Sequence, residues 1–150
     1  MITYLHGNLF SDDAVALVNT VNTVGIMGKG IALAFKKEFP RNFEVYRKAC
    51  SNGQLTAGKI LSVEDNSLLL GRRIVINLPT KIHWKNPSTY QIVAEGLAAL
   101  RQWILDNPVK SLAMPAPGCG NGGLDWEKVK PILTHHLGDI DADIRVYEPL

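Results

Sequence analysis

The chain has 150 residues and a formal net charge of +2, with 46% hydrophobic and 20% charged residues. This length favours a single domain with a substantial buried core, and so small a net charge does not by itself indicate nucleic-acid binding. The two cysteines, Cys50 and Cys119, do not form a disulfide framework or a zinc site by spacing, which favours a reduced, cytoplasmic setting. The N-terminus lacks the pattern of a signal peptide, and no apolar run approaches the roughly 20 residues that span a membrane.

The first half of the chain predicts strands that alternate with helices. Alternating or continuous apolar residues predict strands at Ile2–His6, Ala14–Val18, Lys59–Glu64, Ser67–Leu70 and Arg73–Leu78. Helical spacing of apolar residues predicts helices at Gly30–Phe39, which Pro40 ends, and at Asn42–Cys50. We place the turn between the third and fourth strands at Asp65-Asn66.

The second half continues this alternation. It contains a polar loop at Pro79–Pro87, a helix from the cap Ser88 to about Leu105, a strand at Leu112–Met114, a helix at Trp126–Leu137 capped by Asp125, and a strand at Asp143–Tyr147. Strands that alternate with helices predict an α/β domain in three layers, with a mixed, mainly parallel sheet in the middle. We find no repeat and no domain boundary in the sequence.

The stretch from Val18 to Gly30 reads V-N-T-V-N-T-V-G-I-M-G-K-G and leads from a predicted strand into a predicted helix. Its three glycines let another group approach the backbone closely, and the first N–H groups of the helix have no internal partner. Such a junction suits an anion, most often a phosphate, although a tight turn without a ligand is the alternative. Asn19 and Asn22 favour a ligand, because they are polar side chains at the end of a sheet.

Three polar loops follow strands, at Asn19–Gly30, Pro79–Pro87 and Pro115–Leu124, and ligands of open α/β sheets bind outside the carboxyl ends of strands. Gly118–Gly123 matches G-x-G-x-x-G, but too few residues follow it for a dinucleotide-binding unit. Its glycines can instead wrap their N–H groups around a diphosphate. G-I-M-G-K-G lacks the Ser or Thr of a Walker A loop, which disfavours nucleoside-triphosphate hydrolysis. Two facing glycine loops therefore predict a pyrophosphate held from both sides.

Four stretches resemble macrodomains, and together they cover essentially the whole chain in order. They read H-G-N-L-F, A-L-V-N-T-V-N-T-V-G-I-M-G-K-G-I-A-L-A-F-K, N-L-P-T-K-I-H-W and M-P-A-P-G-C-G-N-G-G-L-D-W. The sequence is most similar to the terminal ADP-ribose glycohydrolase-like branch, and within it to the DarG antitoxin type. The resemblance implies a three-layer α/β/α macrodomain over residues 1–150, as the N-terminal domain of a longer antitoxin.

The resemblance also implies a function. DarG-type antitoxins remove the ADP-ribose that a DarT-type toxin attaches to thymidine in single-stranded DNA, in the bacterial cytoplasm. The implied partners are ADP-ribose, ADP-ribosylated single-stranded DNA and a DarT-type toxin bound through a region outside this chain, with no membrane, cofactor or metal. We expect a monomer. The alternatives are a reader that binds ADP-ribose without turnover, a hydrolase of protein-linked ADP-ribose, and a phosphatase acting on ADP-ribose phosphate.

Lys81 is the catalytic residue that the resemblance implies. Most lysines are solvated charges, but Lys81 follows a buried strand and precedes His83 and Trp84. Partial desolvation beside an aromatic ring makes an amine a usable nucleophile. By resemblance it attacks the C1″ carbon of the distal ribose or a ring-opened aldehyde. The milder alternative is that Lys81 protonates or stabilises the leaving base.

The resemblance also assigns the remaining site residues. Asn22 would orient the distal ribose as the second catalytic residue, although capping its loop is the alternative. The residues expected to bind ADP-ribose are Asn8, Leu9, Asn19, Thr20, Val21, Gly28, Lys29, Gly30, Ile31, Pro117, Gly118, Cys119, Gly120, Asn121, Gly122, Gly123 and Leu124.

Two further side chains are expected near the base of a DNA substrate. His83 contacts the thymine, assists proton transfer or caps its loop, and Trp84 stacks on a base or belongs to the core. Phosphate contacts would come from scattered cations such as Lys29, Lys85 and Arg41. His6, His135 and His136 have no partners at metal-ligand spacing.

The sequence departs from the family pattern at two positions. Asn8 stands where many macrodomains have the aspartate that reads the adenine amino group. Gly122 stands where the eukaryotic terminal-ADP-ribose enzyme has the aspartate that resolves the lysyl intermediate, and Asp125 is better placed to cap its helix. We therefore expect hydrolysis without that aspartate.

Overall fold

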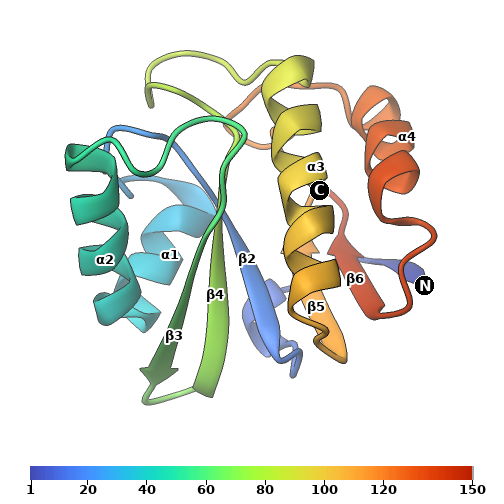
Figure 1. Ribbon diagram of the computed structural model, residues 1–150, viewed down its shortest axis with the longest axis horizontal. Helices are drawn as coiled ribbons and strands as arrows, with labels where there is room; N and C mark the ends of the chain where they lie inside the picture. Colours follow the sequence, from blue (N-terminus) through green and yellow to red (C-terminus); the bar gives the residue numbers. More distant parts are fainter. Residues whose placement is uncertain (150) are drawn as a thin grey trace.

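A six-stranded sheet forms the middle layer of the computed structural model, which describes residues 1–149 (Figure 1). Its strands are β1 (Ile2–Leu5), β2 (Ala16–Val21), β3 (Leu61–Ser67), β4 (Gly71–Pro79), β5 (Ser111–Pro115) and β6 (Asp143–Tyr147), in the order β1-β6-β5-β2-β4-β3. Only the β3–β4 pair is antiparallel within this sheet. The mixed, mainly parallel sheet is therefore confirmed.

Two helices cover each face of the sheet. Helices α3 (Tyr90–Asp106) and α4 (Trp126–Leu137) pack on one face, and α1 (Gly30–Glu38) and α2 (Pro40–Ser51) on the other, in the three layers expected (Figure 1). Neighbouring residues of β2 pack against helices on opposite faces of the sheet, because side chains alternate along a strand. Val18 packs with the α3–α4 side and Leu17 with Phe35 of α1. No described helix meets the length and hydropathy needed to cross a bilayer.

The expected strand at Ser67–Leu70 is wrong. Strand β3 runs through Asp65-Asn66 to Ser67, and the chain turns at Leu68–Leu70 instead. The physical reason is the Ser67 hydroxyl, which accepts hydrogen bonds from the N–H groups of Leu69 (3.1 Å) and Leu70 (3.0 Å). A serine that bonds the backbone two or three residues on competes with strand pairing. Gly71, with φ of 78°, then starts β4.

The expected cap of α3 is also wrong by one residue. Thr89, not Ser88, is the N-cap, and its hydroxyl accepts a hydrogen bond from the N–H of Ile92 (3.1 Å). Ser88 is buried, and its N–H donates to the carbonyl of Gly122 (3.0 Å). Ser88 therefore supports the glycine loop rather than the helix. The expected cap Asp125 is confirmed, because its side chain accepts from the N–H of Glu127 (3.0 Å).

Strand β2 is longer than expected and ends at Val21 rather than Val18. Asn19 and Thr20 continue the ladder, pairing with Asn77 and Leu78 of β4. Pro40 both follows α1 and begins α2, a position where proline's missing N–H costs nothing. The strand at Asp143–Tyr147 is confirmed with its expected bounds.

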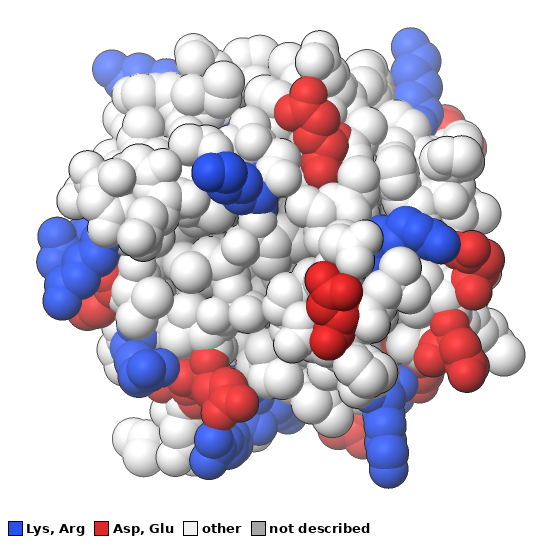
Figure 2. All heavy atoms as spheres, viewed as in Figure 1, with Lys and Arg blue, Asp and Glu red and all other residues white. Residues whose placement is uncertain are grey.

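Charged side chains are spread over the face that Figure 2 shows. Lysines and arginines lie among aspartates and glutamates there, without a large area of one sign. This face agrees with the small net charge of +2.

Candidate functional site

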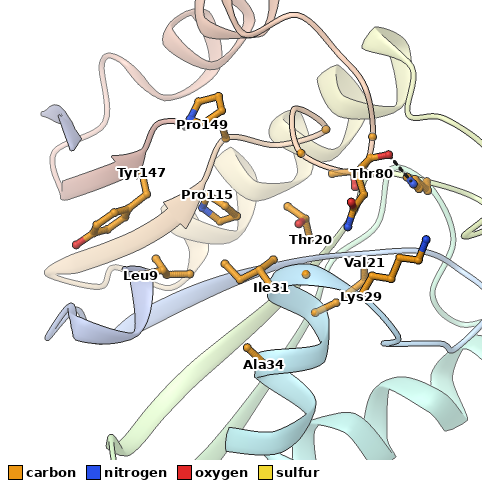
Figure 3. Close-up of a pocket in the computed structure, with 18 of the residues that line it drawn as sticks. Leu9, Thr20, Val21, Lys29, Ile31, Ala34, Thr80, Pro115, Tyr147 and Pro149 are labelled. Atoms are coloured by element: carbon orange, nitrogen blue, oxygen red, sulfur yellow. Dashed lines mark hydrogen bonds between the residues drawn. The ribbon is translucent and has the colours of Figure 1, made fainter. Parts of the chain in front are cut away.

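A cavity of about 930 Å³ opens at the carboxyl ends of β2, β4, β5 and β6. Figure 3 shows the labelled side chains of Thr20 and Val21 from β2, Ile31 from α1, and Pro115 and Tyr147 from β5 and β6 around this space. The location is the one that open α/β sheets use for ligands, and the volume suits a dinucleotide-sized molecule.

Asn22 holds the loop between β2 and α1 in shape. Its Oδ1 accepts hydrogen bonds from the N–H groups of Val24 (3.1 Å) and Ile26 (3.4 Å), and its Nδ2 donates to the carbonyl of Ile26 (2.8 Å). The loop-capping role is therefore present in the structure. One amide N–H of Asn22 has no hydrogen-bond partner in the described chain, and Asn22 lines the cavity.

Tyr46 of α2 holds Asn22 in place from the protein interior. Its fully buried hydroxyl donates to both the main-chain carbonyl and Oδ1 of Asn22, each at 2.9 Å. Burial strongly raises the pKa of Tyr46, so the hydroxyl stays protonated and remains a donor. Sequence reasoning missed this residue, although a tyrosine on the apolar face of a helix signals a hydroxyl that needs a buried partner.

Main-chain hydrogen bonds join the loop after β2 to the loop after β4. Val21 accepts from the N–H groups of Thr80 (2.9 Å) and Lys81 (3.4 Å). The carbonyl of Ile82 accepts from both the N–H (3.0 Å) and the hydroxyl (2.9 Å) of Thr23. These bonds fix the backbone of Lys81 relative to Asn22.

The Lys81 side chain is partly buried and lines the cavity. Its amine donates to two main-chain carbonyls, those of Asn121 (3.0 Å) and Trp84 (3.4 Å). Within residues 1–149, no carboxylate forms an ion pair with this amine. Lys81 thus presents a positive group to the cavity that no side chain neutralises.

The glycine loop, residues 118–123, forms the opposite wall. The N–H groups of Gly120, Asn121 and Gly122 make no hydrogen bond within the described chain. Successive free N–H groups of this kind bind anions. A Cβ at Gly122 would lie 2.4 Å from the carbonyl of Gly118 and 2.4 Å from Ser88 Oγ, so this position requires glycine.

The two glycine-bearing loops meet across the cavity. Gly30 has φ of 56°, and a Cβ there would lie 3.0 Å from Nδ2 of Asn121. Lys29, just before it, is exposed and also lines the cavity. An anion between the walls would therefore meet the N-terminus of α1 on one side and the free N–H groups on the other.

Asn8 and Tyr147 line the far end of the cavity. The Oδ1 of Asn8 accepts from the N–H of Phe10 (3.0 Å) and caps the short 3-10 helix η1 (Leu9–Ser11). The Tyr147 hydroxyl donates to Oδ2 of Asp12 (2.6 Å). Burial and this contact raise the pKa of Tyr147 to about 12.

Asp12 is a buried carboxylate that anchors this end. Its Oδ1 accepts from the N–H of Ala14 (2.8 Å) and from Arg145 (2.6 Å). Burial opposes ionisation, but the hydrogen bonds from Tyr147, Ala14 and Arg145 together hold the pKa of Asp12 below its usual value.

Most of the expected site residues come together in this one cavity. Those that line it are Asn8, Leu9, Thr20, Val21, Asn22, Gly28, Lys29, Gly30, Ile31, Lys81, Trp84, Gly118, Gly120, Asn121 and Gly122. Those that do not are Asn19, His83, Pro117, Cys119, Gly123 and Leu124. Asn19 lies within β2, fully buried, with its Nδ2 directed at the sulfur of Met27 (3.7 Å). Burial raises the pKa of Cys119 to about 11, so its thiol stays protonated at neutral pH.

Sequence reasoning missed part of the lining. These residues are Gly7, Phe10, Ile26, Ala32, Ala34, Thr80, Pro115, Ala116, Tyr147, Glu148 and Pro149. Tyr147 and Glu148 escaped notice because nothing in the sequence states that β6 lies between β1 and β5. The exit of the last strand could have signalled them, since parallel strands end at one edge.

The structure distinguishes the roles weighed for His83 and Trp84. The Nδ1 of His83 accepts from the N–H of Lys85 (3.1 Å), which is a loop cap. Trp84 is 41% exposed and lines the cavity, so it is not a core residue. Arg41 lies in a separate surface pocket, where it donates to the carbonyl of Glu64 (2.7 Å). Within residues 1–149, no three His, Cys, Asp or Glu side chains are placed to hold a metal ion.

Comparison with known proteins identifies the class. The family model of the macro domain matches residues 18–133, and the chain belongs to this family. It is 46% identical to the DNA ADP-ribosyl glycohydrolase of Thermus aquaticus over 100% of this chain, and it spans 42% of that protein's length.

Two solved structures resemble the chain closely. The macrodomain of Mycobacterium tuberculosis DarG matches with a TM-score of 0.94 at 46% identity, covering 100% of this chain and 99% of that one. Thermosipho africanus DarTG in complex with ADP-ribose matches with a TM-score of 0.92 at 35% identity, covering 99% of this chain and 42% of that one. The resemblance to DarG-type macrodomains is confirmed.

Proposed function

We propose that this macrodomain is a DNA ADP-ribosyl glycohydrolase that removes ADP-ribose from thymidine in single-stranded DNA and so reverses a DarT-type toxin. The observation that carries the proposal is the Lys81 amine, held in the cavity by two main-chain carbonyls and neutralised by no carboxylate of the described chain. A similar protein is named DNA ADP-ribosyl glycohydrolase, and a similar structure contains ADP-ribose, which supports the same function.

ADP-ribose would bind with its two phosphates between the glycine-bearing loops. The N-terminus of α1 at Gly30 and the free N–H groups of Gly120–Gly122 supply the donors. The distal ribose would then lie beside Lys81 and the remaining N–H of Asn22. The adenine would lie at the end formed by Asn8, whose Oδ1 has a second lone pair for the adenine amino group.

Lys81 can act in two ways. In the covalent route, the neutral amine attacks C1″, the bond from C1″ to the thymine breaks, and the thymine takes up a proton. Water then displaces the lysine from C1″, which releases ADP-ribose and restores the amine. In the electrostatic route, the charged Lys81 stabilises the negative charge of the departing thymine without giving up a proton. Water attacks C1″ directly, and a proton of that water passes to the thymine.

The test is release of ADP-ribose from an oligonucleotide with one ADP-ribosylated thymidine. Lys81→Ala should lower the rate about 100-fold or more, which is the scale of one lost acid, base or nucleophile. Calorimetric affinity for ADP-ribose should stay within about threefold, because the donors that hold the phosphates are main-chain N–H groups. No release by the wild type, despite tight ADP-ribose binding, would refute the proposal.

Lys81→Arg separates the two routes. Arginine keeps the positive charge but does not deprotonate in proteins, so it cannot act as the nucleophile. Partial retention of activity supports the electrostatic route, and a loss equal to that of Lys81→Ala supports the covalent one.

A reader without turnover is the second candidate, and the composition of the cavity favours it. Among the described residues, Glu148 is the only carboxylate that lines the cavity, and it follows Tyr147 at the far end. Among residues 1–149, the lining near Lys81 therefore contains no carboxylate that could activate water. Hydrolysis would need a water activated by the substrate itself or by Lys81, and the activity assay decides between the two candidates.

The wider biological setting belongs to the same proposal. The chain would be the N-terminal domain of a longer antitoxin, and it spans 42% of the Thermus aquaticus relative. The similar Thermosipho africanus protein is named as a fusion of a DNA ADP-ribosyl transferase with a DNA ADP-ribosyl glycohydrolase, which supports a DarT-type partner. The proposal places the protein in the cytoplasm, because its DNA substrate is there. It also takes the protein to be a monomer.

A further inference from the structure

Exposed apolar side chains gather on the two loops beside Lys81. Nine large hydrophobic residues of the described chain are exposed, and four of them, Val24, Ile26, Ile82 and Trp84, lie on these loops. We call these four residues the apolar rim. Isolated exposed hydrophobic residues are ordinary, but a group beside a ligand cavity marks a binding surface.

The loops that carry the apolar rim lie side by side. The bonds from Thr23 to the carbonyl of Ile82 join them, and both loops leave the same end of the sheet (Figure 1). Ile26 and Trp84 also line the cavity itself. The apolar rim is therefore continuous with the place where the distal ribose would lie, and a group attached to C1″ would emerge onto it.

Trp84 is held in a fixed setting. The ring of His83 stacks against it with centroids 5.5 Å apart and planes 30° apart. The amine of Lys85 lies 5.2 Å from the ring centroid. An aromatic ring that is braced and still 41% exposed is a platform for another flat group.

The segments that carry the apolar rim supply only positive charges. The segments 14–37, 74–94 and 107–124 supply most of the cavity walls and contain no aspartate or glutamate. They bring Lys29, Lys81 and Lys85 to this end of the molecule. The face in Figure 2, by contrast, mixes both signs. The surroundings of the apolar rim thus suit an anionic chain.

We propose that the apolar rim binds the nucleotides that flank the modified thymidine, with bases on Trp84 and Ile82 and phosphates near Lys85. The inference rests on the proposed function and extends it from the modified nucleotide to its neighbours. Bases have apolar faces that stack on aromatic rings, and their phosphates pair with lysines. An acidic peptide would match the lysines but not the exposed aliphatic and aromatic surface.

The test compares two substrates, ADP-ribosylated thymidine as a free nucleoside and the same nucleoside within a single-stranded oligonucleotide. For the wild type, kcat/KM should be about tenfold or more higher for the oligonucleotide, which is the gain expected from stacking one base. Ile82→Glu should remove most of this gain by repelling the phosphates, and it should leave the nucleoside unaffected.

The control is Leu105→Glu, which introduces the same charge at an equally exposed apolar residue. Ile82 is 55% exposed and Leu105, on α3, is 54% exposed. Lys85→Gln should also reduce the salt dependence of the oligonucleotide KM, by about 0.7 in the log–log slope, whereas Lys110→Gln, just before β5, should not.

Two other sets of results would overturn the inference. Equal kcat/KM for both substrates, or an equal loss on both in Ile82→Glu, shows that flanking nucleotides do not touch the apolar rim. Rim-dependent turnover of an ADP-ribosylated acidic peptide, but not of the oligonucleotide, assigns the apolar rim to protein.

A binding measurement separates failure of the inference from failure of the proposed function. If the wild type hydrolyses neither substrate, the proposed function fails. Fluorescence anisotropy of an unmodified, dye-labelled oligonucleotide, with ADP-ribose saturating, then still tests the apolar rim. Ile82→Glu should weaken this binding at least threefold relative to Leu105→Glu, and equal binding by the two variants refutes the inference.

Discussion

The hydrogen bonds of Tyr46 predict the effect of removing a single oxygen. Tyr46→Phe deletes the hydroxyl that donates to the main-chain carbonyl and Oδ1 of Asn22, both at 2.9 Å. Asn22 Oδ1 keeps its bonds from Val24 and Ile26, so no acceptor side chain is left without a partner. The cost is therefore that of one buried hydrogen bond, about 1–1.5 kcal/mol of unfolding free energy.

Urea denaturation measures this cost, with the m-value expected to be unchanged. Tyr4→Phe is the matched control, because the Tyr4 hydroxyl contacts only Thr134, near the surface, and its loss should cost under about 0.5 kcal/mol. The looser loop should also lower kcat for ADP-ribosylated DNA, because Asn22 would lose one of the groups that hold it in place. Equal stability of Tyr46→Phe and the wild type would refute the account of how the loop is supported.

Three further predictions concern the glycine loop and the far end of the cavity. Gly122→Ala should cost about 1–3 kcal/mol of unfolding free energy by overpacking against Ser88, whereas Gly120→Ala, whose Cβ meets nothing within 4 Å, should match the wild type in the same urea titration. Ser88→Ala should stabilise the fold by about 0.5–1 kcal/mol, because its buried hydroxyl has no partner among the described residues, and destabilisation in urea would contradict this. Asp12, whose pKa is lowered in the fold, stabilises the protein above its unfolded pKa near 3.8, and this contribution is lost as the pH falls through the folded value. Thermal unfolding midpoints should therefore fall more steeply below about pH 4 in the wild type than in Asp12→Asn, and parallel curves would disprove it.

Much of the fold could be predicted because local patterns agreed with the final packing. The apolar face of α3 is typical of a helix packed on a core, and the run R-I-V-I-N-L of β4 is typical of a buried strand. The prediction of a strand at Ser67–Leu70 was wrong because its leucines suggested a buried strand, whereas the Ser67 hydroxyl stabilises a turn. Hydrophobicity alone does not record such a competition between a side chain and the backbone.

The site was predictable where one loop carries the chemistry and was missed where distant segments meet. The loops that contain Lys81 and Asn121 can be recognised in the sequence by their composition. The bond between Tyr147 and Asp12 joins residues 135 positions apart, and only the strand order reveals it. The role of Asn22 was undecided for a related reason, since its partner Tyr46 comes from another element.

The main-chain hydrogen bonds between the loops after β2 and β4 have a consequence for how the substrate preference of such a protein can change in evolution. Thr23 and Lys81 hold these loops together mostly through backbone atoms, which substitution does not remove. The side chains of Val24 and Ile82 are exposed and are free to vary. Descendants of one ancestral cavity could therefore exchange the molecule to which ADP-ribose is attached by changing a few exposed residues, while the part that binds ADP-ribose is inherited intact.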